Sequence, residues 1–369
     1  MSPVMTDTIE IRPSAHPASA EERARRMTNP GFGRVFTDHM VVVPYKEGQG
    51  WGPGVLKAYG PIEMDPAASV LHYGQAIFEG FKAYHQPDGS VASFRPEANA
   101  RRFNASAARL AMPELPEEIF LEAARALITQ DRAWVPGAVG ESLYMRPLMI
   151  ATEAALGVRA SNEYLFILMA SPSGAYFPAG VKPVTVWISD DYVRAAPGGT
   201  GFAKCAGNYA ASLVAQRQAK GEGCDQVVWL DAIHREYIEE MGGMNIFFVY
   251  QEKGETVVVT PELTGTLLPG ITRDSLLQLA REQGYRAEER KISVDEWKAA
   301  IAEGRMTEAF ACGTAAVITP IGQVKSRRGE WLVNKGETGP VAARLREVLL
   351  NLQHGLAPDT HGWMKKIAG

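Results

Sequence analysis

One lysine in the chain has an unusual setting. Lys204 lies within GGTGFAKCAGNY, residues 198–209, where four glycines leave the backbone free to bend. A phosphate-binding P-loop requires Ser or Thr after its lysine, and here Cys205 follows. A lone lysine in a glycine-rich loop is usually a solvated surface residue. The alternative is a lysine held in a fixed pose, which forms a Schiff base with a carbonyl compound such as pyridoxal phosphate.

Pyridoxal phosphate makes further demands on a protein, and the first concerns its phosphate. The segment TLLPGITRDSLLQLA brings Gly270, Ile271 and Thr272 to the start of an expected helix, where free N–H groups favour an anion. A simple helix cap at or near Thr272 is the alternative. ACGTAAV offers a second glycine turn, with the amides of Thr314 and Ala315.

The cofactor ring needs a carboxylate at its pyridine nitrogen and a donor at its phenolic oxygen. YIEEMGGMN places Glu239 and Glu240 before two glycines and an apolar run. An inward carboxylate is costly unless it meets a cation such as a protonated pyridine, whereas a solvated turn would need no partner. Tyr209, five residues after Lys204, is a candidate donor to the phenolic oxygen, although a tyrosine there can serve only for packing.

Composition excludes several other classes of protein. The 369 residues suffice for roughly two domains, and 46% apolar with 22% charged residues is ordinary for a globular protein. A net charge of −4 gives no basic field for nucleic acid, and no run approaches the ~20 apolar residues of a membrane span. The N-terminus has no apolar segment of a signal peptide. Three scattered cysteines and seven scattered histidines argue against a disulfide scaffold and a metal site, and favour the cytoplasm.

The hydrophobic pattern predicts mixed α/β material in two parts, with the boundary at the turn-rich stretch SPSGAYFPAG. Residues before 70 are predicted to be irregular, because Gly and Pro are frequent there. The pattern predicts helices over 97–112, 117–134, 208–221 and 272–284, and strands over 142–151, 163–171, 184–189, 225–231, 244–250 and 256–260. Residues 308–322 resemble two strands joined through Gly313.

Taken together, these segments resemble the branched-chain amino-acid aminotransferases, which are fold-type-IV pyridoxal-phosphate enzymes. APGGTGFAKCAGNYAAS, EEMGGMNIF, LLPGITRDS, ACGTAAV, LHYGQAIFEGFKAY and LYMRP occur in the family's order, and the similarity runs from about Gly31 to the C-terminus. The resemblance implies a smaller N-terminal α/β domain and a larger C-terminal mixed-sheet domain. The expected ranges are a tail at 1–30, a small domain at 31–172, an interdomain loop at 173–182 and a cofactor-binding domain at 183–369.

The resemblance also implies roles for particular residues. Lys204 would bind the cofactor covalently and act as the catalytic base, Glu240 would pair with the pyridine nitrogen, and Tyr209 would donate to the phenolic oxygen. Arg102 would bind the phosphate with Ile271, Thr272 and Thr314; it is preferred to Arg101 because it directly precedes an apolar residue, Phe103. The substrate pocket would comprise Tyr73, Phe78, Tyr144 and Arg146, with the Thr314 and Ala315 amides receiving the α-carboxylate.

The activity implied is reversible transamination of L-leucine, L-isoleucine and L-valine with 2-oxoglutarate, by a ping-pong scheme through pyridoxamine phosphate, in a homodimer without a metal. D-amino-acid aminotransferases and aminodeoxychorismate lyases of the same fold class are alternatives, as is a pyridoxal-phosphate-binding protein without turnover. A cofactor-free Schiff-base aldolase would have no use for Arg102 together with the 271–272 turn. Two departures from the family stand out: Ala206 replaces a glycine, and Ala316 and Thr319 stand where some relatives carry a redox cysteine pair. No thiol switch is therefore expected.

Overall fold

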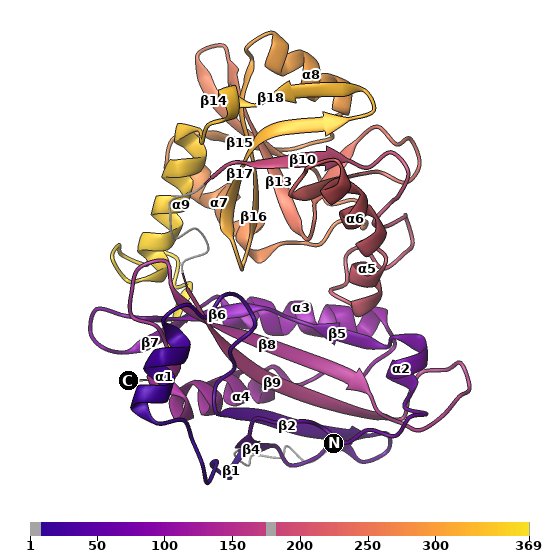
Figure 1. The fold of residues 1–369 in the computed structure, drawn as a ribbon, viewed down its shortest axis with the longest axis vertical. Coiled ribbons are helices and arrows are strands. Elements are labelled where there is room, and N and C mark those ends of the chain that lie inside the picture. Colours follow the sequence, from indigo (N-terminus) through magenta and orange to yellow (C-terminus); the bar gives the residue numbers. More distant parts are fainter. Residues whose placement is uncertain (1–8, 175–181, 369) are drawn as a thin grey trace. The chain divides into compact units, whose positions relative to one another are not determined.

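The computed structural model describes residues 9–174 and 182–368 (Figure 1). The described chain forms two units. Residues 9–174, 204–206 and 352–368 make up the first, and residues 182–203 and 207–351 the second. Each unit combines a β-sheet with helices, so the predicted two-domain α/β fold class is confirmed. The expected interdomain loop at 173–182 falls largely outside the described residues, and the expected domain ranges stay a prediction.

The first unit is built on a mixed, mostly antiparallel sheet in the order β1-β4-β2-β9-β8-β6-β7-β19, with β3 paired to β2 and β5 to β8. Its strands are β1 (Glu10–Ile11), β2 (His39–Lys46), β3 (Gly50–Trp51), β4 (Val55–Ala58), β5 (Ala76–Phe78), β6 (Phe81–His85), β7 (Val91–Phe94), β8 (Ser142–Ala151), β9 (Glu163–Ser173) and β19 (Met364–Ala368). Its helices are α1 (Ala20–Met27), α2 (Ser69–Tyr73), α3 (Pro96–Arg109) and α4 (Glu117–Gln130), with a 3-10 turn at Arg132–Trp134.

Burial explains why β8 and β9 are nearly continuous apolar runs. The two strands pair antiparallel along ten residue pairs, from Ser142↔Ser173 to Ala151↔Tyr164, and lie side by side in Figure 1. Helix α4 packs against β2 and β9. Phe103 and Phe120 from the helices meet Phe81 and Phe166 from the sheet, with ring centroids 5.6 to 6.2 Å apart. Each ring is buried, and burying one contributes about 1.5–3 kcal/mol.

The second unit contains a sheet in which part of the strands closes on itself. The order is β12-β11-β10-β17-β16-β13-β14-β15, β18 pairs with β17, and β13 also pairs with β12, so β12, β11, β10, β17, β16 and β13 form a ring. The strands are β10 (Val184–Ile188), β11 (Gln226–Leu230), β12 (Ile238–Met241), β13 (Met244–Glu252), β14 (Glu255–Thr260), β15 (Arg286–Glu289), β16 (Met306–Gly313), β17 (Val317–Ser326) and β18 (Gly329–Leu332). The helices are α5 (Ala206–Ala210), α6 (Leu213–Gly221), α7 (Ile271–Glu282), α8 (Val294–Ala302) and α9 (Pro340–Gln353), with a 3-10 turn at Asn334–Gly336; α5 begins and α9 ends with residues of the first unit.

The structure departs from the sequence prediction in two places. The region before residue 70 is not irregular, because β2 and β4 pair within the first sheet and β2 is buried from His39 to Val43. The helix predicted over 208–221 is interrupted between α5 and α6. Its interruption has a local cause: the Ser212 hydroxyl donates to the Tyr209 carbonyl at 2.7 Å and competes with the helical backbone pattern.

Candidate active site

The backbone of Lys204 is fixed on both sides by the first unit. Its N–H donates to the Ser106 hydroxyl of α3 at 2.9 Å, and its carbonyl accepts from the Phe78 N–H of β5 at 3.0 Å. Cys205 forms an isolated β-bridge with Ile77. The Lys204 side chain then extends across an aromatic ring, with Nζ 5.0 Å from the Phe78 centroid. The lysine is therefore held in place by sheet and helix, and it is only partly exposed.

Two of the glycines before Lys204 are required for different structural reasons. Gly198 takes a positive φ of 76°, which side chains rarely adopt. Gly201 lies against the carbonyl of Thr266, since a Cβ there would stand 2.2 Å from that oxygen. Ala206, by contrast, begins α5 without a positive φ, so its position does not require the glycine that the family usually has.

A buried carboxylate, Glu79, faces Arg102 and was missed from the sequence. Arg102 Nε donates to Glu79 Oε1 at 2.6 Å and Nη2 donates to Oε2 at 2.8 Å, which is a bidentate pair. Asn99 Nδ2 adds a third bond at 2.8 Å, and the Glu79 side chain is fully buried. Burial alone would raise the pKa of Glu79, but the charge and hydrogen bonds of Arg102, with the charge of Lys204, lower it overall. Glu79 thus holds Arg102 in one orientation.

The neighbouring Arg101 has a different environment. Its side chain is 61% exposed and pairs with Glu117 at 3.6 Å. The structure therefore distinguishes the two arginines, as the sequence prediction did, although the role of Arg102 toward a phosphate stays a prediction.

Three of the four predicted pocket residues of the first unit come together near Lys204. Tyr144 and Arg146 lie on the same face of β8, and Arg146 Nη2 donates to the Tyr144 hydroxyl at 3.0 Å. The Arg146 guanidinium stands 4.8 Å from the centroid of the Phe78 ring, the ring that Lys204 also approaches. Arg146 Nε is buried and has no hydrogen-bond partner among the described residues. A buried unpaired donor beside an aromatic wall suits an anionic group of a ligand.

Tyr73 lies elsewhere in the first unit. It ends α2, its side chain is 43% exposed, and its hydroxyl donates to the Leu156 carbonyl. This contact accounts for its position without any part in the cluster of Phe78, Tyr144 and Arg146. Its predicted role in substrate binding therefore remains a prediction.

In the second unit, Glu240 is buried in a network of donors. Arg194 Nε donates to its carboxylate, as do the Leu268 N–H at 3.0 Å and Asn245 Nδ2 at 3.3 Å. Only 2% of Glu240 is exposed. The cation that Glu240 contacts is Arg194, an arginine that sequence reasoning did not identify, and its predicted pairing with a pyridine nitrogen stays a prediction. Tyr209 and Glu240 both line a small cavity of about 30 Å³.

The predicted phosphate turn is the N-terminus of α7. The helix begins at Ile271, its N-cap is Gly270, and no side chain caps it. Only glycine fits at position 270, because the Asn245 side chain lies against it and a Cβ would stand 2.0 Å from Asn245 Oδ1. The first amides of α7 are thus available to an anion, and the helix dipole favours one.

Thr314 and Ala315 connect β16 to β17, and both are partly exposed. Cys312, which precedes this turn, is 1% exposed, and burial raises the pKa of its thiol. All three cysteines are free and buried. Within residues 9–174 and 182–368, no group of three or more His, Cys, Asp or Glu side chains is placed to hold a metal ion.

Comparison with known proteins defines the class. Residues 76–324 match the family model "Amino-transferase class IV". The chain is 60% identical to a probable branched-chain-amino-acid aminotransferase of Streptomyces coelicolor over 98% of its own length and 99% of that protein's. It is 56% identical to the branched-chain-amino-acid aminotransferase of Mycobacterium tuberculosis, over 96% of each protein.

Solved structures agree with these relatives. The branched-chain amino acid aminotransferase of Escherichia coli superposes with a TM-score of 0.72 at 28% identity, covering 88% of this chain and 99% of that one. The T.th. branched-chain amino acid aminotransferase with pyridoxamine 5'-phosphate gives 0.71 at 30% identity, covering 88% and 98%. The chain belongs to the branched-chain-amino-acid aminotransferase family, within the class IV aminotransferases. Enzymes of this class use pyridoxal phosphate.

The residues of each unit, taken separately, fit that cofactor. The first unit contains a fixed lysine and a buried arginine, and the second contains a buried carboxylate and a helix N-terminus without a side-chain cap. These are the groups that an aldehyde, a phosphate and a pyridine nitrogen require.

Proposed function

We propose that the protein transfers the amino group of L-leucine, L-isoleucine or L-valine to 2-oxoglutarate, and catalyses the reverse reaction. The observation that carries the proposal is the cluster around Lys204, in which Lys204 and Arg146 both lie over the Phe78 ring and Arg146 also donates to the Tyr144 hydroxyl. The aromatic wall suits a branched side chain. The arginine and the hydroxyl suit the second carboxylate of glutamate.

Each predicted residue has a distinct task in this proposal. Pyridoxal phosphate, when bound, supplies an electron sink for the charge that develops when the substrate loses its Cα proton. Lys204 would hold the cofactor through Nζ, and once the substrate amine has replaced that nitrogen, the freed Lys204 amine would take the substrate Cα proton. Glu240 would keep the ring nitrogen protonated, and Tyr209 would donate to the phenolic oxygen.

The anionic groups are bound by charge and by amides. Arg102, Thr314 and the Ile271 and Thr272 amides would hold the phosphate, and the Thr314 and Ala315 amides would receive the substrate α-carboxylate. Glu79 supports this task because its bidentate pair fixes the guanidinium of Arg102.

Overlapping use of the three branched substrates is expected. A hydrophobic pocket gains only about 1–3 kcal/mol per methylene, so leucine, isoleucine and valine should differ modestly in kcat/KM. Rates that differ by several orders of magnitude would contradict this view of the pocket.

The visible spectrum of the purified protein tests the proposal. L-leucine added without an acceptor should abolish the band of the bound cofactor, and 2-oxoglutarate should restore it, while D-alanine should have no effect. Lys204→Ala should abolish turnover and still bind the cofactor. A cofactor band that changes with D-alanine but not with L-leucine would indicate a D-amino-acid aminotransferase instead. Near-native activity of Lys204→Ala would refute the mechanism.

A homodimer is part of the proposal, and one surface of the first unit supports it. Tyr73 of α2 contacts Leu156, and Leu71 lies two residues before Tyr73 on the same helix; Leu71, Tyr73 and Leu156 are 61%, 43% and 64% exposed. Exposed apolar side chains grouped in this way are typical of protein interfaces. Residues of both chains would then line each active site, with Tyr73 at the interface. Sedimentation velocity of Leu156→Asp should show monomers, and an unchanged dimer would exclude this surface.

We also propose that the protein is cytoplasmic. Its free buried cysteines suit a reducing compartment. None of the helices in the described ranges has the length and apolarity that crossing a bilayer requires. Fractionation of cells that express the protein would test the location, and recovery outside the cytoplasm would contradict it.

A further inference from the structure

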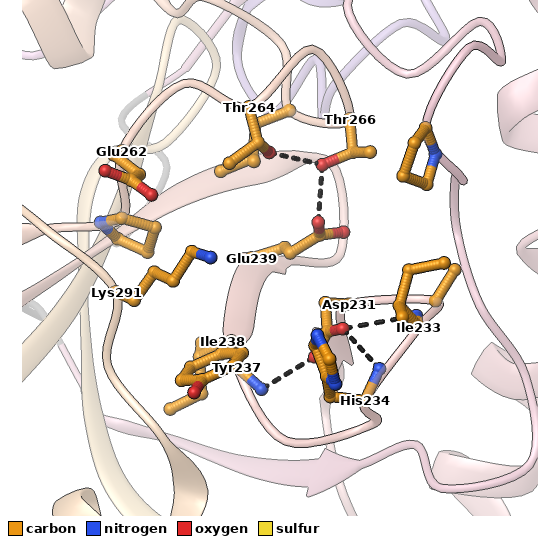
Figure 2. A pocket seen from close by; sticks show the side chains of 14 residues that line it. Asp231, Ile233, His234, Tyr237, Ile238, Glu239, Glu262, Thr264, Thr266 and Lys291 are labelled. Carbon is orange, nitrogen blue, oxygen red and sulfur yellow. Dashed lines mark hydrogen bonds between the residues drawn. The ribbon is translucent and has the colours of Figure 1, made fainter.

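A second pocket lies on the other side of β12 from the Glu240 cavity, and we call it the outer pocket (Figure 2). Successive side chains of a strand point to opposite faces, so Glu240 lines the small cavity with Tyr209 while Glu239 lines the outer pocket. The outer pocket has a volume of about 190 Å³. Its walls come from parts of the segments 231–239 and 261–267, together with Pro197 and Lys291.

Glu239 places a buried carboxylate in this pocket. The residue is 6% exposed, and one carboxylate oxygen accepts from the Thr266 hydroxyl, which lies 2.7 Å from the Thr264 hydroxyl. The other oxygen has no hydrogen-bond donor among the described residues. Burial, with the charge of Glu240, raises the pKa of Glu239 although the Thr266 bond lowers it. A buried carboxylate with a free oxygen is costly, and an ammonium group would compensate it.

A second carboxylate of the lining, Asp231, already has hydrogen-bond donors. Asp231 accepts four backbone N–H groups from residues 233–237, at distances between 2.6 and 3.2 Å. Burial alone would raise the pKa of Asp231, but these four bonds lower it overall. Asp231 therefore shapes the turn after β11. Glu262, the third carboxylate of the lining, is only partly buried, so Glu239 is the buried acceptor for a ligand.

Lys291 supplies the opposite charge at the other side of the outer pocket. Its ammonium lies 5.2 Å from the centroid of the Tyr237 ring and points into the pocket in Figure 2. Among the described residues, no carboxylate lies within 4.0 Å of it. Ile238, Pro261 and Leu267 contribute apolar wall to the outer pocket.

We propose that the outer pocket binds a small α-amino acid, with its ammonium at Glu239 and its carboxylate at Lys291. The volume lies below the ~300–1,000 Å³ of pockets for drug-sized ligands, so a single amino acid suits it. The apolar wall favours an aliphatic side chain. This site is separate from the one that holds the cofactor, and it does not depend on the proposed transamination.

Equilibrium dialysis of the holoenzyme with radiolabelled α-methyl-L-leucine tests the proposal. This probe has no Cα hydrogen, so amino transfer cannot consume it. Glu239→Gln keeps the side-chain shape and the Thr266 contact but removes the negative charge. We expect this variant to bind one equivalent of α-methyl-L-leucine per chain fewer than the wild type. Lys291→Met should lower the affinity of the same equivalent at least tenfold.

Glu337→Gln and Lys220→Met, at exposed positions of the second unit away from the pocket, serve as matched controls and should bind like the wild type. If the wild type and Glu239→Gln bound the same number of equivalents of the probe, the proposal would be overturned. Unchanged affinity of Lys291→Met for the probe would also overturn it, because the ligand carboxylate would then not need Lys291. Thermal denaturation of each variant shows whether the fold is kept.

Discussion

Glu79→Gln is the perturbation from which we expect the clearest energetic result. The variant leaves the Arg102 guanidinium, 10% exposed, without its buried carboxylate partner and with the positive charge of Lys204 nearby. Removing one member of a buried pair typically costs about 3–5 kcal/mol, because the remaining charge is uncompensated. Opening of the first unit should therefore become more favourable by about 3 kcal/mol or more.

Hydrogen–deuterium exchange of peptides from β6 and α3 reports on this unit alone. At about 1.36 kcal/mol per tenfold, a loss of 3 kcal/mol accelerates exchange by roughly a hundredfold. Glu122→Gln is the control, since its pair with Arg125 is exposed and worth at most about 0.5 kcal/mol. A change in Glu79→Gln as small as in this control would refute the reasoning.

The pH dependence gives a second check on the same variant. Because the folded protein lowers the pKa of Glu79, the stabilisation is fully present above the unfolded value of about 4.3. It is lost as the pH falls from there through the lowered pKa. The difference between wild type and Glu79→Gln should be constant from pH 7 to about 5 and shrink below.

Two further variants test the pocket and a buried helix contact. Arg146→Met removes the unpaired Nε, and the KM for 2-oxoglutarate should rise about 10–100-fold while that for leucine changes little, because a hydrogen bond to a charged group is worth about 1.5–3 kcal/mol. Parallel rises in both KM values would contradict the assignment. Glu308→Gln acts at the start of α9, where Glu308 accepts the Val341 and Ala342 N–H groups and burial raises its pKa. The wild type should lose stability relative to this variant as the pH rises from about 4.3 through the raised pKa, and thermal denaturation between pH 4 and 8 should show it; a difference independent of pH would refute it.

The features that the sequence predicted well are those that depend on a local pattern of residues. The apolar runs at 142–151 and 163–171 are strands β8 and β9, since both are buried along most of their length. The glycine-rich segment before Lys204 is confirmed as a loop. Such features need no knowledge of the rest of the chain, because hydrophobic period and glycine content act within a few residues.

The missed residues depend on distant partners. Glu79 lies in IFEGF, and nothing in that pentapeptide shows that Arg102, 23 residues later, returns to it. Arg194 and Glu240 are 46 residues apart in sequence. The outer pocket draws on four separate segments, so no local pattern marks it. Strand β2 was missed for a simpler reason: Pro44 stands within it, and proline is usually evidence against an inner strand.

The pairing of β19 with β7 has a consequence for the order in which the protein matures on the ribosome. Met364 pairs with Phe94 and Lys366 with Ala92, so the sheet of the first unit takes its edge strand from residues that are synthesised after the whole second unit. Until those residues leave the ribosome, β7 presents unpaired backbone groups, and exposed edges of this kind invite aggregation. The first unit is begun before the second and completed after it, and a stop codon before residue 364 would leave an otherwise intact enzyme with an open sheet.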